Sequence, residues 1–162
     1  MRKQKGFSLI ELLIVVAIIL IIAAIAIPNL LRSRIAANEA SAVGSLRTIN
    51  TAEVTYASTY PSNGFASALT TLGPPSGGGN TATSTNAILL DSVLGCTTQP
   101  CTKSGYLFSI NNTSGTPVSF YSSAASPVTQ NQTGNRYFYS DASGVIRYNA
   151  TSAATSTDNP LQ

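Results

Sequence analysis

Glu11 is the one charged residue in an otherwise apolar segment, residues 7–31. An ionised carboxylate in lipid or in a packed core is unfavourable by several kcal/mol unless a partner neutralises it, so such a residue usually marks a pairing site. One partner is local, because Ser8 and Glu11 have the spacing of a capping box at a helix start. The other is a positive charge on a neighbouring chain, and the residues alone leave both open.

The next candidates for chemistry are Cys96 and Cys101, in the stretch CTTQPC. Two thiols so close together in an exported chain predict a disulfide. Closing so short a loop contributes about 2 kcal/mol on the chain-entropy estimate, so the bond mainly fixes a local loop. The alternative is a pair of free thiols. A zinc or CxxC redox site fits neither the spacing nor the lack of further ligands.

Histidine is absent from the sequence, which removes the usual activation of serine and cysteine nucleophiles and the commonest transition-metal ligand. The sequence also shows no clustered carboxylates, no phosphate-binding glycine loop and no metal-ligand set. We therefore predict that the protein is not an enzyme, and we predict no catalytic residue, no metal and no cofactor.

The formal net charge of +3 comes from the N-terminal tip, because three of the nine basic residues are Arg2, Lys3 and Lys5. Without them, six basic residues face six acidic ones. Positive charge before an apolar run holds that end on the cytoplasmic side of a membrane. The remaining basic residues form no run that could bind phosphates, so no nucleic-acid partner is predicted.

Glu11 lies in a segment whose pattern predicts a long helix. Residues 7–31 are long and apolar enough to span a bilayer. Pro28 lacks an N–H and disfavours helical backbone at Ile27, so we expect a kink or local break there. Residues 32–60 continue as an amphipathic helix, with a stripe at Leu31, Ile35, Ala42, Leu46, Ile49, Tyr56 and Tyr60. Glu53 falls in this stripe, either bonded or at its exposed edge.

Residues 61–162 predict one globular head. Pro61 and Gly64 end the helix near Tyr60, and a glycine-rich surface loop covers residues 73–86. Four short runs favour strands, starting at Gly105, Val118, Arg136 and Val145. The last two flank a turn, residues 141–144, and form an antiparallel hairpin. The polar tail, residues 151–162, is expected to be mobile. The predicted fold class is α+β, a long helix packed on a small antiparallel sheet.

Arg2, Lys3, Gln4, Lys5 and Gly6, followed by FSLIE and an apolar helix, resemble the class III leader and N-terminus of type IV pilins and of type II secretion pseudopilins. The resemblance covers residues 2–35 and implies a leader, residues 1–6. It implies that a prepilin peptidase cuts between Gly6 and Phe7 and methylates the new amino group of Phe7. The precursor would lie in the inner membrane bilayer, be handled by inner-membrane assembly machinery, and form a helical homo-oligomeric filament as an extracellular pilus.

The resemblance also implies roles for two residues of the helix. Glu11 of one subunit would pair with the Phe7 amine of the next, which sets the register of subunit assembly. Pro28 stands where pilins commonly have a helix-loosening proline, and the resemblance implies that the helix would melt locally there when subunits pack.

Two other functions stay open at this point. The chain could be a pseudopilin, whose short periplasmic filament serves type II protein secretion, because the N-termini of the two groups are shared. It could also be a secreted or membrane-anchored binding protein with an ordinary signal peptide cut after Ala24, Ile25 and Ala26. Glu11 and Pro28 fit an ordinary signal peptide poorly.

Overall fold

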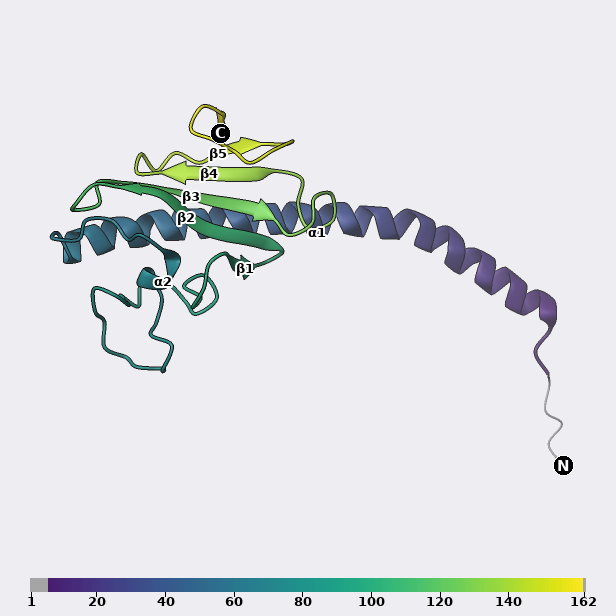
Figure 1. Cartoon of the computed structure of the whole chain (residues 1–162). Coiled ribbons are helices and arrows are strands. Elements are labelled where there is room, and N and C mark those ends of the chain that lie inside the picture. Colours follow the sequence, from purple (N-terminus) through teal and green to yellow (C-terminus); the bar gives the residue numbers. More distant parts are fainter. Residues whose placement is uncertain (1–5, 162) are drawn as a thin grey trace. The chain divides into compact units, whose positions relative to one another are not determined.

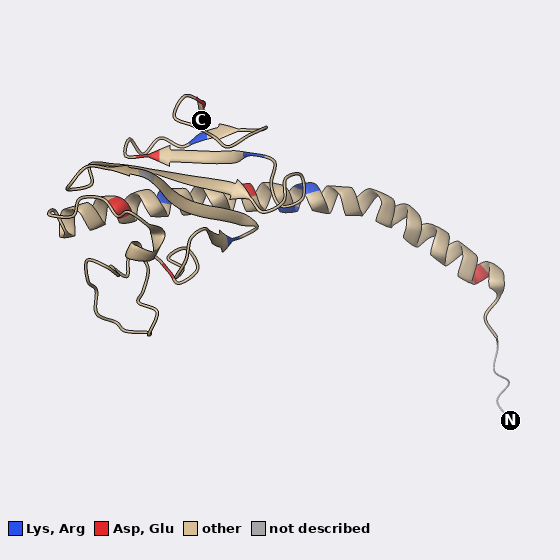
Figure 2. Ribbon diagram, in the orientation of Figure 1, with Lys and Arg blue, Asp and Glu red and all other residues tan. Residues whose placement is uncertain are grey.

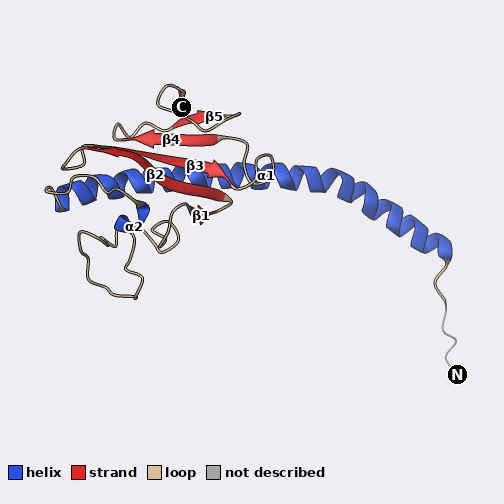
Figure 3. Ribbon diagram, viewed as in Figure 1, coloured by secondary structure: helices blue, strands red, loops and turns tan. Residues whose placement is uncertain are grey.

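The computed structural model describes residues 6–161, with Asn112 by its backbone alone. Helix α1 spans Leu9–Thr59 and helix α2 spans Leu69–Leu72 (Figure 3). Contacts divide the chain into two compact units, residues 1–34 and 35–162. We describe each unit by itself. Of the predicted leader, residues 1–5 lie outside the described residues.

The first unit consists of the start of the chain and the N-terminal part of α1. One acidic residue near the helix start is followed by a long stretch without charge (Figure 2). Pro28 lies inside the helix, and the helical backbone continues on both sides of it. Of the expected kink or local break at Pro28, a break is absent from this single chain, and a kink stays a prediction. The missing N–H still removes one helical hydrogen bond, so this turn is held less tightly than its neighbours.

The head unit is built on a six-stranded antiparallel sheet with the strand order β1-β2-β3-β4-β5-β6. Figure 1 shows the sheet lying along the part of α1 that belongs to this unit. Because every neighbour in the sheet is also the next strand along the chain, short connections suffice throughout. The strands are β1 (Cys101–Lys103), β2 (Tyr106–Ser114), β3 (Phe120–Pro127), β4 (Tyr137–Asp141), β5 (Arg147–Asn149) and β6 (Asn159–Pro160).

The core of the head lies between one face of α1 and the sheet. The helix contributes Ala42, Leu46, Ile49 and Tyr56, which are buried as the amphipathic pattern predicts. The sheet contributes large side chains that include Tyr106, Phe108, Tyr121 and Phe138. Helix residues at steps of three and four share one face, so burial against a sheet selects that face. Leu31, which the pattern placed in the same stripe, is exposed in the first unit.

The α+β fold class is confirmed, and so are the four predicted strands and the β4–β5 hairpin. Gly144 adopts a φ of 73° in the hairpin turn, where a side chain would be strained. Strands β1 and β6 and helix α2 were not predicted. The prediction of a mobile tail is wrong at its end, because β6 pairs with β5 and the Leu161 N–H donates to the Ile146 carbonyl at 2.7 Å.

Candidate assembly site

The predicted processing site lies just before the helix. Gly6 and Phe7 are exposed and non-helical, and the Phe7 side chain is 81% exposed. A Cβ built on Gly6 meets no atom within 4 Å. The chain itself therefore does not require glycine at this position, which leaves recognition by another protein as a reason for it.

The carboxylate of Glu11 has a hydrogen-bond donor within its own chain for one of its two oxygens. The Ser8 backbone N–H donates to Glu11 Oε2 at 2.9 Å, and the Leu12 N–H donates to the Ser8 carbonyl at 3.3 Å. This is one half of the predicted capping box, with Ser8 as the N-cap and Glu11 reaching back to it. The carboxylate also lies near the positive end of the helix dipole. Among the described residues, Glu11 Oε1 has no hydrogen-bond donor.

Beyond Glu11 the helix presents apolar side chains on every side. The large apolar residues from Phe7 to Leu31 are exposed. Together they form a far larger apolar surface than a soluble protein exposes without a partner. Within the described chain, α1 is the one helix that is long and apolar enough to cross a membrane. Lipid, or other helices of the same kind, would remove this surface from water.

Glu39 was not singled out from the sequence, although it lies in the buried stripe. Its side chain is buried, and Oε1 accepts the backbone N–H groups of Asn135 at 2.9 Å and Arg136 at 3.2 Å. The Arg136 Nε–H donates to Glu39 Oε2 at 2.8 Å. The guanidinium group also lies over the rings of Phe138 and Tyr148, 5.4 and 5.3 Å from their centroids. Helix α1 is thus joined to the segment that leads into β4 by an ion pair with three hydrogen bonds.

Glu53 is fully buried, so the alternative of an exposed edge position is wrong. Its Oε2 accepts the Ala66 N–H at 2.7 Å, from the segment that follows the helix. Oε1 is buried with no partner among the described residues. Burial raises the pKa of Glu53 to about 8, and the hydrogen bond from Ala66 opposes that shift. The helical spacing that placed Glu53 in the apolar stripe could also have placed Glu39 there, seven residues before Leu46.

The disulfide between Cys96 and Cys101 is confirmed, with the two Cα atoms 5.6 Å apart. Cys101 is buried and begins β1, whereas Cys96 lies in the preceding loop. The bond therefore ties that loop to the edge of the sheet, whereas the short spacing predicted only that it fixes a local loop.

Comparisons with known proteins agree with this N-terminal geometry. Residues 1–27 match the family model described as the prokaryotic N-terminal methylation motif. The type IV wide pilus major component PilA4 of Thermus thermophilus is 67% identical over 39 residues, which make up 24% of this chain and 30% of that protein. The N-terminal segment of this chain is thus similar to that of a type IV pilin. The predicted resemblance is thereby confirmed.

A second relative, the type IV major pilin protein PilA of Myxococcus xanthus, is 45% identical over 54 residues, 33% of this chain and 24% of that protein. The chain thus spans less than a third of the length of either relative. No solved structure matches the chain. The α+β architecture of the head is therefore described from its own helix and antiparallel sheet.

Proposed function

We propose that the protein is the structural subunit of a type IV pilus, assembled by packing of its N-terminal helices. The observation that carries this proposal is the joint placement of Gly6, Phe7 and Glu11 at the start of an exposed apolar helix, within the matched methylation motif. Two relatives that are named as major pilus components support it. The role is structural, and we assign no catalysis.

Maturation creates the partner of Glu11. A prepilin peptidase cuts between Gly6 and Phe7 and methylates the new amino group. Before the cut, the Phe7 nitrogen is a neutral amide; afterwards it is a cation four residues before Glu11. Gly6 and Phe7 are exposed, which supports access by the peptidase to the bond between them.

The local bond of Glu11 does not prevent pairing between subunits. The Ser8 N–H uses one of the two carboxylate oxygens, and an ionised carboxylate has about four acceptor positions. Helices packed side by side with an axial stagger bring the Phe7 amine of one subunit to Glu11 of the next. In a water-poor filament core this pair would be strong, because an unpaired carboxylate there is unfavourable by several kcal/mol.

The partners follow from the same surface. The precursor lies in the inner-membrane bilayer, with its basic tip on the cytoplasmic side. Inner-membrane assembly machinery then moves subunits into an extracellular helical homo-oligomer, in which residues 7–31 pack on one another. Pro28 supports local melting on packing, because the turn there already lacks one hydrogen bond.

The test is mass spectrometry of purified surface filaments. The expected result is that this chain is the main component and begins with N-methylated Phe7. Loss of protein secretion without loss of surface pili on gene deletion would instead identify a pseudopilin. A mature chain that starts at Ile27 would identify an ordinary signal peptide.

A further inference from the structure

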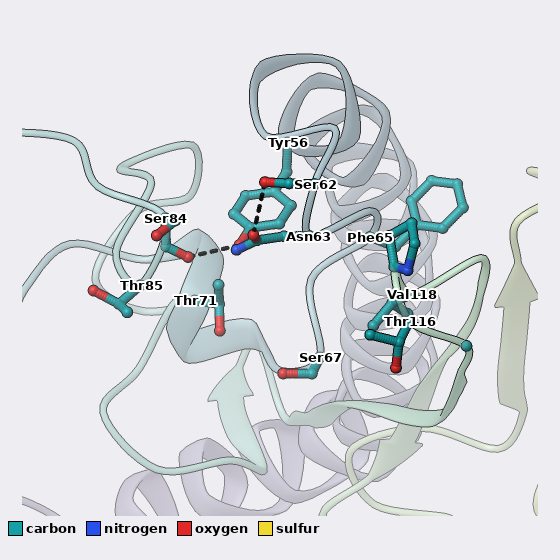
Figure 4. Close-up of a pocket in the computed structure, with 12 residues that line it drawn as sticks. Tyr56, Ser62, Asn63, Phe65, Ser67, Thr71, Ser84, Thr85, Thr116 and Val118 are labelled. Carbon is teal, nitrogen blue, oxygen red and sulfur yellow. Dashed lines mark hydrogen bonds between the residues drawn. The ribbon is translucent and has the colours of Figure 1, made fainter.

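A pocket of about 440 Å³ opens on the head where several chain segments converge (Figure 4). This volume lies within the roughly 300–1,000 Å³ range of small-molecule sites. The packing of residues 7–31 in a filament makes no use of it. Its lining residues come from the end of α1, the segment after it, α2, a loop and the β2–β3 connection.

The inner wall of the pocket is held by Tyr56. Its side chain is 2% exposed, and its hydroxyl donates to the Ser84 carbonyl at 2.6 Å. The same hydroxyl accepts the Asn63 Nδ2–H at 3.2 Å. Figure 4 shows the ring of Tyr56 beside Asn63, with Ser84 next to them. One buried side chain thus joins the helix to two of the loops that form the wall.

The segment after α1 is fixed on its other side as well. The Val118 N–H donates to the Asn63 carbonyl, and the Phe65 N–H donates to the Val118 carbonyl, both at 2.9 Å. A Cβ on Gly64 would lie 2.1 Å from the Val118 oxygen, so this close approach requires glycine. The Ala66 N–H is bound by Glu53. The pocket is preformed, and a ligand would lose little free energy in ordering it.

The lining is rich in hydroxyl groups and carries no charge. The hydroxyls of four exposed or half-exposed lining side chains form no hydrogen bond with another described residue: Ser67, Thr71, Ser84 and Thr116. In Figure 4 Thr71, Ser67 and Thr116 surround the opening. Pro117 and Val118 add apolar surface. No acidic or basic side chain belongs to this described lining.

This chemistry selects a class of ligand. A hydroxyl both donates and accepts, so unpaired serine and threonine hydroxyls match a ligand whose own hydroxyls do the same. An anion or a cation would lose hydration without meeting an opposite charge. A purely apolar ligand would leave the protein hydroxyls unpaired. We propose that this pocket binds a neutral saccharide unit, with its hydroxyls on the serine and threonine side chains and its C–H face on Pro117 and Val118.

The test uses the full-length chain in micelles of a detergent that has no sugar headgroup. The probes are the methyl glycosides of glucose, galactose, mannose and N-acetylglucosamine, titrated to about 10 mM, which covers weak sites. Saturation-transfer NMR measures binding. At least one glycoside is expected to bind saturably. Thr71→Val removes one unpaired hydroxyl at constant volume and is expected to weaken that binding about threefold to tenfold, the effect of one hydrogen bond.

A second variant, Ser67→Trp, fills the opening from an exposed position and is expected to abolish binding. Thr102→Val, an exposed threonine on β1 outside the pocket, is the matched control and should bind like the wild type. Near-UV circular dichroism checks that each variant folds; if Ser67→Trp does not fold, Thr71→Val decides alone.

Two results would overturn the proposal. One is the absence of saturable binding to every probe, and the other is wild-type affinity in folded Thr71→Val and folded Ser67→Trp. If the wild type binds no probe and folded Ser67→Trp fails to form filaments, the pocket instead receives a segment of a neighbouring subunit. The binding measurements themselves do not depend on whether the chain forms a pilus.

Discussion

The backbone N–H of Ser8 donates a hydrogen bond of 2.9 Å to Oε2 of Glu11, so the acid of the apolar helix has a local partner before any assembly. The bond uses a backbone donor and one carboxylate oxygen. The charge of Glu11 is not neutralised by it, because a neutral N–H supplies no cation. The helix cap and the subunit contact therefore depend on different properties of the same side chain, and a substitution can separate them.

Glu11→Gln should keep the cap and abolish most filament assembly. The amide oxygen still accepts the Ser8 N–H, but the side chain no longer attracts the Phe7 amine of a neighbour. Sheared surface filaments, compared with total cellular protein by immunoblot, measure the effect. Ser8→Ala keeps the backbone N–H and should assemble normally. Filament yield at the wild-type level in Glu11→Gln would exclude the charge pair.

Gly6→Val should accumulate as the full-length precursor. A Cβ at Gly6 has free space in the chain itself, so the expected block comes from crowding in the peptidase and not from misfolding. Gly44→Ala is the matched control, because Gly44 also has free space but lies far along α1, and it should be processed normally. The size of the membrane-bound chain by mass spectrometry distinguishes the two. Normal cleavage of Gly6→Val would contradict the predicted cut site.

Because of Glu53, the free energy of unfolding of the head should fall as the pH rises from 5 to 8. The folded chain holds the proton up to a pKa of about 8, whereas the unfolded chain releases it near pH ~4.3. Between these values the native state binds more protons, so the free energy of unfolding falls with pH, by several kcal/mol in total, and levels off above 8.

Glu53→Gln should remove this dependence, because the amide oxygen still accepts the Ala66 N–H and does not ionise. Urea unfolding of the full-length chain in micelles, followed by near-UV circular dichroism at several pH values, gives the difference between the two proteins. Taking the difference cancels the contributions of Asp91 and Asp158. Parallel curves for wild type and variant would show that Glu53 is not protonated in the fold.

Glu39→Ala should destabilise the head by about 3 kcal/mol. The change leaves two backbone N–H groups and the Arg136 guanidinium without their acceptor, and removing a charged partner from part-buried donors typically has an effect of this size. Lys103→Ala is the control. It breaks the exposed Lys103–Asp91 pair and should change stability by less than about 1 kcal/mol. Similar midpoints in urea for the two variants would refute the assigned role of Glu39.

Replacing both Cys96 and Cys101 with alanine should lower the free energy of unfolding by about 2 kcal/mol, because the loop that the disulfide closes is short. Reducing the wild type should produce a similar loss, and the reductant should not affect the double variant. A collapse of the whole sheet without the bond would show that it does more than fix the edge of β1.

The sequence determined the parts of this protein whose signals are local. The apolar run, the basic tip and the Gly6–Phe7–Glu11 spacing indicated the N-terminal family. The four runs of β-favouring residues and the turn at Gly144 gave the central strands, since alternation and turn chemistry act over a few residues. The pairing of Cys96 with Cys101 followed from their short separation.

Only the tertiary structure decided which groups bind the carboxylates of Glu39 and Glu53. Helical spacing places Glu39 and Glu53 on the apolar face, but their donors are Arg136, 97 residues later, and Ala66 in a segment without a distinctive pattern. Strand β6 likewise exists because β5 offers it an unpaired edge, although a polar tail predicts no strand. Contacts of this kind form only when the helix and sheet bury a common core, because burial makes an unpaired carboxylate unfavourable and so selects the contacts that satisfy it.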